Sequence, residues 1–305
     1  MFNNLASFNI SRCDNYFCIF VARKVIEKTM SKKIPHIILL ILLITNCTKT
    51  DISDNAARLR IKLTNSPMLM ISDESMAVRE IKLHIQSIEV AVTDTTSVEV
   101  GEWIPLDFSG GQYNMLSLTN GKNTQLVDQY FPAFKTIRRV KIKLGNNNRI
   151  ITTSVQNSGI ELIIPQEISE GIVLNVNENL YANIISSLVI DIRALITETN
   201  GNYFLNPTIR VFSEVATGSI KGYVAPIEAQ AIVSVVNEID TFFSFPESDG
   251  MFVFPGLREG KWKIGIFPNQ LSGFKDTIFT DSVLPLKITE LKPNPIRLHP
   301  ISNNP

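Results

Sequence analysis

The residues best suited to catalysis are few and widely separated in this sequence of 305 residues. His84 alternates with apolar neighbours, which predicts the polar face of a strand and an exposed imidazole, and His299 beside Pro300 has the same interpretation. The sequence contains no His-Glu-x-x-His motif, no cysteine–histidine pair and no Gly-x-Ser-x-Gly turn. It therefore predicts neither a zinc hydrolase nor a cysteine or serine nucleophile, and we assign no catalytic residue and no metal ligand.

Paired carboxylates are the remaining catalytic possibility, because glycoside hydrolysis can run on Asp and Glu alone. The candidates are Glu99 with Glu102, Asp107, and Glu247 with Asp249. All of them fall in segments predicted as loops or turns, where solvated charge is the ordinary state, and the last pair lacks the ligands of a calcium loop. A carboxylate-based glycan hydrolase is thus the alternative to a non-catalytic function, and we expect no cofactor.

Aromatic side chains are the remaining candidates for ligand binding. Trp103 and Tyr113 lie near predicted loops of the first half of the chain. Phe243 and Phe245 occupy alternate positions and are predicted to face a core, so Phe242 is placed on the opposite face, which leaves its exposure open. Core packing is the favoured interpretation for Trp103, Tyr113 and Phe242, ligand binding is the alternative, and no ligand is assigned to them.

A short apolar run ends at a cysteine near the start of the chain. Lys32 and Lys33 precede the run at residues 37–44, and Cys47 follows. A basic start, a short apolar core and a small-residue exit are typical of a secretory signal, and the run is shorter than the roughly 20 residues that span a membrane. The segment resembles the lipobox of bacterial lipoproteins, which implies that Cys47 is joined to diacylglycerol. An uncleaved signal anchor is the alternative.

Residues 1–47 are therefore interpreted as an upstream extension followed by the signal. A signal works from the extreme N-terminus, so we expect translation to begin at Met30, which would leave Cys13 and Cys18 outside the protein. The mature chain then keeps one cysteine and has no disulfide framework. Residues 48–57 are polar without an apolar period, which predicts a flexible tether.

Charge limits the partners of the exported part. The whole chain has 29 Lys and Arg and 29 Asp and Glu, and residues 1–47 remove six and two of these, so the remainder carries 23 − 27 = −4. Nucleic acid is excluded as a partner, because phosphate binding relies on clustered cations. We expect contact with the membrane through the lipid on Cys47 and, as other partners, a glycan or another envelope protein.

Hydrophobic alternation with a period of two dominates from residue 58 onward. It is clear at residues 58–64, 81–92 and 139–144, with a change of phase near Ser87 that predicts a bulge. The only predicted helix is short, at residues 124–130, ended by Pro132. The sequence predicts an all-β chain with two antiparallel β-sandwich domains in tandem after a signal peptide and short tether.

The break between two runs of predicted strands places the boundary between these domains near Gly218. The first domain is expected at residues 58–217 and the second at residues 218–305, where seven or eight short strands follow one another. Asp249-Gly250 stands between two runs rich in phenylalanine and predicts a hairpin turn.

Both domains carry family resemblances. In the first, the segments concerned are residues 63–67, 87–90, 103, 114–121, 131–144 and 206–210. They resemble domain of unknown function 4382, a family common in exported proteins of Bacteroidota, which has no assigned activity. In the second domain, residues 218–224, 249–257 and 260–264 resemble the carboxypeptidase regulatory-like, transthyretin-type sandwich. That resemblance implies a non-catalytic accessory or spacer module.

Taken together, these features predict a lipid-anchored protein of the cell envelope with a non-catalytic binding or structural display role. We expect it at the outer membrane, facing the periplasm or the surface. Carbohydrate or protein binding is the leading version, with a glycan hydrolase and a subunit of an envelope assembly as alternatives.

Overall fold

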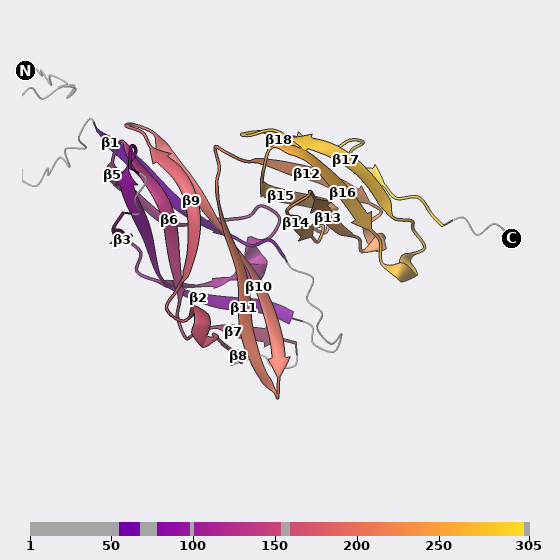
Figure 1. Cartoon of the computed structure of the whole chain (residues 1–305). Coiled ribbons are helices and arrows are strands. Elements are labelled where there is room, and N and C mark those ends of the chain that lie inside the picture. Colours follow the sequence, from indigo (N-terminus) through magenta and orange to yellow (C-terminus); the bar gives the residue numbers. More distant parts are fainter. Residues whose placement is uncertain (1–54, 68–77, 98–100, 154–158, 302–305) are drawn as a thin grey trace, which may run out of the picture. The chain divides into compact units, whose positions relative to one another are not determined.

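The computed structural model describes residues 55–67, 78–97, 101–153 and 159–301. Residues 53–305 form one compact unit. The signal, Cys47 and most of the predicted tether lie outside the described residues. Figure 1 shows the described part as strands joined by turns, and the only helical turns in it are four short 3₁₀ segments.

The N-terminal region, residues 55–213, is built on one sheet of 11 strands. The order across the sheet is β5-β1-β10-β11-β8-β7-β2-β6-β9, and β3 and β4 pair with β2. The strands are β1 (Ala56–Thr64), β2 (Val78–Asp94), β3 (Trp103–Pro105), β4 (Gly111–Asn114), β5 (Thr124–Pro132), β6 (Lys135–Leu144), β7 (Arg149–Thr152), β8 (Ile160–Ile163), β9 (Ile172–Leu180), β10 (Ile185–Thr199) and β11 (Asn202–Ser213). The 3₁₀ turns are η1 (Met115–Leu118) and η2 (Gln166–Ile168).

Strand β2 is long enough to serve several neighbours along its length. It pairs with β7 at its start, with β4 and β3 along one edge, and with β6. The register with β6 shifts between Ile85 and Ser87, which confirms the bulge predicted from the change of phase, and again between Ala91 and Val92. The first shift places an extra residue in β2 and the second places one in β6, so the side chains before and after the extra residue face opposite sides of the sheet in the strand that carries it.

The longest pairing in the region is the β10–β11 hairpin, whose two salmon-coloured strands run side by side in Figure 1. Asn200 and Gly201 form its turn with φ values of 52° and 76°. Positive φ at both central residues is what a tight hairpin turn requires, and Asn and Gly tolerate it best. The turn predicted from Asn200-Gly201 is therefore present.

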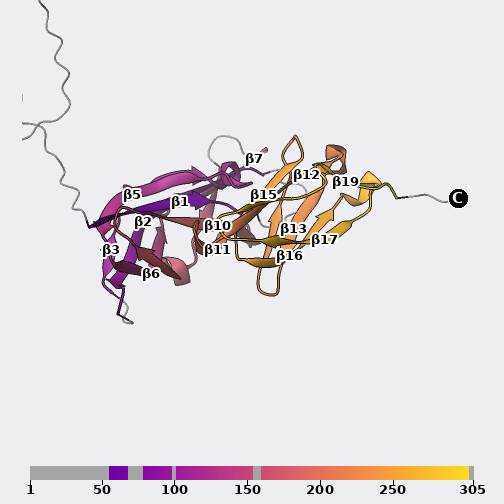
Figure 2. The same ribbon diagram turned by 90° about the horizontal axis from the view of Figure 1, so that it is seen from above.

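The C-terminal region, residues 218–301, has two sheets. Strand β12 pairs with β15, β18 and β19 in one sheet, and the other has the order β14-β13-β16-β17. Figure 2 shows the second set, with β13, β16 and β17 next to one another. The elements are β12 (Gly218–Ala225), β13 (Ile232–Val236), β14 (Thr241–Ser244), β15 (Met251–Leu257), β16 (Gly260–Phe267), β17 (Thr277–Val283), β18 (Ile288–Glu290), β19 (Ile296–Arg297), η3 (Ile227–Ala229) and η4 (Gln270–Ser272).

Each region has its own hydrophobic core. In the first core, the alternating side chains Leu59, Ile61 and Leu63 of β1 are fully buried. In the second core, Trp262 is 1% exposed and lies among Phe242, Phe252 and residues of the β16 strand. The two clusters share no residue. Alternation of apolar and polar residues along the strands is what supplies each core from one face of a sheet.

The prediction of an all-β chain is confirmed, with one difference in how the strands pair. Most neighbouring strands are antiparallel, but β1 with β10, β11 with β8, and β12 with both β18 and β19 are parallel. Parallel neighbours need connections that cross over, and no short-range signal in the sequence marks such a connection.

Two local predictions are wrong. The expected helix at residues 124–130 is strand β5, which pairs with β1 over its length, so tertiary pairing overrides a weak local preference. Asp249-Gly250 does not close a hairpin, because β14 pairs with β13 while β15, which begins at Met251, pairs with β12. The turn instead carries the chain from one sheet to the other. A local turn signal does not specify which strands pair on either side of it.

Candidate functional site

Trp103 lies on the outer face of the N-terminal sheet. In the register of β3, β2, β6 and β9, Trp103 is opposite Ala91, Ala91 is opposite Arg139, and Arg139 is opposite Asn175. The neighbouring pair Val90 and Val140 is fully buried in the first core, so this row points away from it. Trp103 is partly exposed. It belongs to the surface of the sheet, so the favoured interpretation of Trp103 as a core residue is wrong.

Two cations lie over the Trp103 ring. The Arg139 guanidinium carbon is 5.3 Å from the ring centroid, and Lys141 Nζ is 4.9 Å from it. Lys141 also pairs with Glu89 at 2.7 Å. Cations within about 6 Å of an indole face are attracted by its quadrupole. The contact holds the ring in place on the sheet surface.

Tyr113 packs on the first core. It lies on β4 opposite Leu83 of β2. Its hydroxyl lies close to Gly111 of the same strand, only 2.8 Å from the position that a Cβ atom on this glycine would take. Burial raises the pKa of Tyr113. Trp103 pairs with a different part of β2, so the structure does not bring Trp103 and Tyr113 into one site.

Phe242 packs in the second core, as the favoured interpretation had it, but the assignment of its side of the strand to the outer face is wrong. Phe242 is 2% exposed and faces Trp262, with ring centroids 6.0 Å apart, whereas Phe245 is 45% exposed. The expectation rested on a hairpin with β15. Because β14 pairs instead with β13, where Phe242 is opposite the buried Val235, the other face of β14 points to the core.

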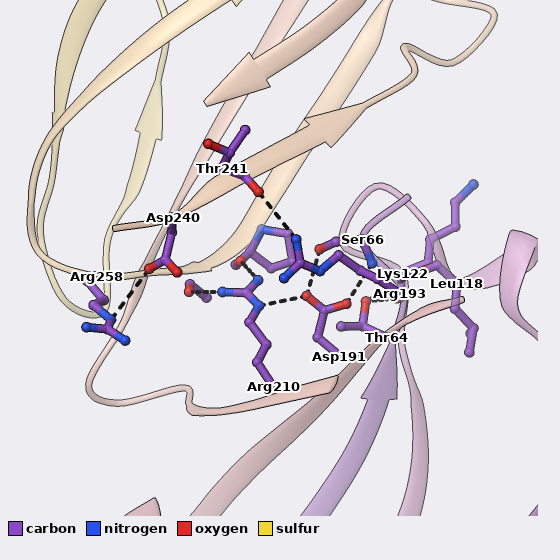
Figure 3. A network of polar contacts seen from close by, with 12 residues as sticks. Thr64, Ser66, Leu118, Lys122, Asp191, Arg193, Arg210, Asp240, Thr241 and Arg258 are labelled. Atoms are coloured by element: carbon purple, nitrogen blue, oxygen red, sulfur yellow. Dashed lines mark hydrogen bonds and ion pairs between the residues drawn. The ribbon is translucent and has the colours of Figure 1, made fainter. Parts of the chain in front are cut away.

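Asp191 is the centre of a polar network that joins the two regions, drawn in Figure 3. Its side chain is fully buried. It accepts hydrogen bonds from the backbone N–H and the hydroxyl of Ser66, both at 2.7 Å, and from Arg210 Nε at 2.8 Å. Arg210 in turn donates to the carbonyls of Gly256 at 2.7 Å and Pro255 at 3.0 Å. One buried carboxylate thus orients the arginine that binds β15.

Phe242 forms the apolar counterpart of this junction. The Arg210 guanidinium carbon is 4.0 Å from its ring centroid and that of Arg193 is 5.3 Å away. Arg193 also donates to the carbonyl of Thr241 at 3.3 Å. Burial lowers the pKa of Arg193. Two cations of the N-terminal region therefore cover an aromatic residue that belongs to the second core.

A second polar contact lies beside the first. Asn120 of the N-terminal region donates to the carbonyl of Phe245 at 3.0 Å, and its side-chain oxygen accepts from Ser244 and, at 3.4 Å, from the backbone of Val253. Asn120 is 8% exposed and has a φ of 55°. We name Asn120, Asp191, Arg193, Arg210 and Phe242 the junction.

The candidate carboxylates are not assembled into a catalytic pair. Glu99 lies outside the described residues, and Glu102 and Asp107 are exposed. Glu247 forms an ion pair with Lys122 at 2.7 Å, and Asp249 accepts from the backbone of Met251 at 2.9 Å. Glu247 is thus held in an ion pair and Asp249 in a turn, and neither contact assembles a catalytic pair.

Some functional residues were missed by sequence reasoning, and some of its expectations need correction. The sequence carried one signal for the junction, since Asp191 and Arg193 interrupt the apolar run of β10. His84 is not a free surface imidazole: it is half-buried, its Nδ1 has no hydrogen-bond partner, and it lies against Gly145. Within the described ranges, no three His, Cys, Asp or Glu side chains gather as metal ligands. No helix there is long and apolar enough to cross a membrane.

A known protein family matches most of the N-terminal region. Residues 56–207 match the family Domain of unknown function (DUF4382). The expected resemblance to this family is therefore confirmed over that DUF4382 stretch, which contains Trp103, Asp191 and Arg193 but ends before Arg210. The resemblance of the C-terminal region to the carboxypeptidase regulatory-like sandwich stays a prediction. No curated protein matches the chain.

Solved structures give distant similarities. The Bacillus anthracis TIE protein is 11% identical, with 90% of this chain and 46% of that chain covered and a TM-score of 0.23. This chain thus spans about half the length of that protein. GBS52, the minor pilin of Streptococcus agalactiae, is 11% identical, with 82% and 98% covered and a TM-score of 0.23. A putative adhesin from Bacteroides ovatus ATCC 8483 is 12% identical, with 85% and 99% covered and a TM-score of 0.23. Scores at this level do not establish a shared fold.

Removal of Arg210 tests the junction. Arg210→Met leaves Asp191 buried without its cation, so we expect a loss of about 3–5 kcal/mol in the free energy of unfolding, measured by urea denaturation of the full chain. Arg58→Met, which removes a 40% exposed side chain paired with Asp128, is the control and should cost about 1 kcal/mol or less. Combining Arg210→Met with Asp191→Asn should cost less than the two changes summed. Equal losses for Arg210→Met and Arg58→Met would contradict a special role for the junction.

Acid should destabilise the β1–β5 pair. Burial alone would raise the pKa of Asp128, but hydrogen bonds and charge from Arg58 and Arg60 outweigh it and lower that pKa. A carboxyl whose pKa is lower in the folded than in the unfolded state stabilises the folded protein at pH values above the ordinary pKa of about 4. This stabilisation is lost as the pH falls through the folded-state pKa. The urea midpoint should therefore drop below about pH 4, and less steeply in Asp128→Asn. The exposed Asp276→Asn is the control, and an unchanged slope in Asp128→Asn would contradict the assignment.

Proposed function

We propose that this chain is a lipid-anchored protein of the cell envelope whose exported part holds a binding surface in a fixed orientation and has no catalytic role. The observation that carries the proposal is the junction, in which the buried Asp191 and Arg210 tie the N-terminal region to β15. The layout of residues 30–47 supports export and a lipid on Cys47.

The physics of the junction favours a rigid connection. Bending the two regions apart would remove Arg210 from the carbonyls of Pro255 and Gly256 and expose Phe242 to water. Breaking a hydrogen-bonded buried charge costs much more than breaking a surface contact. An ordinary flexible link between domains would not need such contacts. Fixed geometry suits a protein that displays a surface at a defined distance from a membrane.

The contact at Gly256 supports the same interpretation. Its φ is 66°, and a Cβ built on it would lie 2.5 Å from the ring of Phe212 on β11. Both the backbone conformation and the space therefore favour glycine at this position. Close packing of β15 on β11 leaves the Gly256 carbonyl within reach of Arg210.

Distance measurements test the rigidity of the junction. Spin labels on Thr96→Cys and Leu271→Cys, in a chain with Cys13, Cys18 and Cys47 changed to Ser, report the separation of the two regions, and both positions are exposed. We expect a single narrow distance distribution that broadens in Arg210→Met and not in Arg58→Met. A broad distribution in the parent would overturn the proposal of a fixed orientation.

The anchor requires a separate test in cells. Radiolabelled palmitate should be incorporated into the wild-type chain and not into Cys47→Ala, and the variant should move from the membrane to the soluble fraction. Several acyl chains hold a protein on a membrane far more stably than one. Thr48→Ala, one residue after the cysteine, is the matched control and should behave like the wild type. Retention of label or of membrane association in Cys47→Ala would contradict the lipid anchor.

A further inference from the structure

We propose that the outer face of the sheet around Trp103 binds an acidic saccharide, a sugar ring that carries a carboxylate. The site consists of Trp103, Ala91, Arg139 and Asn175, which we name the Trp103 surface. These four residues form one row across β3, β2, β6 and β9. This inference rests on the proposed function, because it names the class of ligand that the displayed surface would bind.

The floor of the Trp103 surface is Ala91. Neighbouring strands lie about 4.8 Å apart, so Trp103 and Arg139 are separated by two strand spacings with Ala91 between them. Ala91 is fully buried although it lies on the outer face. Its small side chain lets the indole and the guanidinium approach to 5.3 Å above it. A larger residue at this position would push the two apart.

Arg139 differs from the other cations of β6, which have polar partners in the described part of the chain. Lys135 pairs with Asp94 at 2.5 Å, Lys141 with Glu89 at 2.7 Å and Lys143 with Glu170 at 3.6 Å.

Arg138 next to it donates to Asn177 Oδ1 at 2.7 Å and to the carbonyl of Ser97 at 3.2 Å. For Arg139, by contrast, the one contact found among the described residues is the Trp103 ring. Its Nε, like that of Arg138, is buried without a hydrogen-bond partner. An unpaired guanidinium keeps donors in a fork that matches a carboxylate.

A second pair of an aromatic residue and an arginine lies on the same sheet, but its arginine already has a carboxylate partner. Arg58 lies 5.8 Å from the ring centroid of Tyr130, which is 53% exposed. Its guanidinium is already held by Asp128, at 2.9 Å for one of the contacts. The cation found beside Tyr130 is therefore already paired with a carboxylate, and this pair is a matched internal control for the Trp103 surface.

The chemistry of the row selects one class of ligand. Trp103 is partly exposed, and an indole suits the apolar C–H face of a sugar ring. Arg139 offers a bidentate site to the carboxylate of that sugar, and the exposed Asn175 carries an amide that can bond a hydroxyl. A neutral sugar would leave Arg139 unpaired. A nucleic acid would need clustered free cations, whereas Lys141 and Lys143 are already paired with carboxylates.

Titration calorimetry of the full chain in a non-ionic detergent tests the proposal with two probes. One is the trisaccharide of galacturonic acid and the other is the neutral galactose trisaccharide. We expect the acidic probe to bind and the neutral one to bind at least about tenfold more weakly. Trp103→Ala and Arg139→Gln should each weaken binding of the acidic probe by about tenfold or more, with Arg139→Lys between them and the parent.

The control variants are Tyr130→Ala and Arg138→Gln, which should leave the affinity within about twofold of the parent. Absence of binding, equal binding of both probes, or equal losses for Trp103→Ala and Tyr130→Ala would each overturn the proposal. Circular dichroism and the urea midpoint of each variant separate a lost site from a lost fold. Because the protein is used in detergent solution, failure here leaves the tests of the anchor and of the junction unaffected.

Discussion

A fully buried carboxylate sets the constraint on which the arrangement of the two regions depends. Asp191 has no access to water, so its charge must be met by protein groups, and Ser66 and Arg210 meet it. Arg210 is thereby fixed in a position where its remaining donors point at the carbonyls of β15. The same guanidinium covers Phe242, an edge of the second core. A single polar requirement inside the molecule therefore connects two otherwise separate hydrophobic cores.

The outer face of the sheet follows from the alternation of the strands and from the bulge in β2 near Ser87. After the register shift at Ser87, Val90 points to the core and Ala91 to the surface. Trp103 and Arg139 then meet above Ala91, although 36 residues separate them in the sequence. A one-residue slip of β2 would place Val90 outside and dismantle both the core and the Trp103 surface. Stability of the fold and geometry of the candidate site thus share one register.

Local patterns served well where a side chain's position depends on its own strand, and failed where it depends on the partner strand. The alternation in β1 and the bulge at Ser87 were predictable, as was the turn at Asn200. The strand face of Phe242 was assigned wrongly because the partner of β14 was taken to be β15. The helix expected at residues 124–130 became β5 because β1 offered a pairing partner.

The sequence alone determined that this protein is built of strands, where many of those strands run and which of its residues are apolar enough to form a core. Those properties are local, since alternation and turn chemistry depend on residues a few positions apart. Only the tertiary structure decided that Asp191 and Arg193 belong to a junction, that Phe242 is buried beneath two arginines and that Arg139 lies beside Trp103 without a carboxylate partner among the described residues. Each of those facts requires strands distant in the chain to be paired in one register, and that register is set by long-range packing.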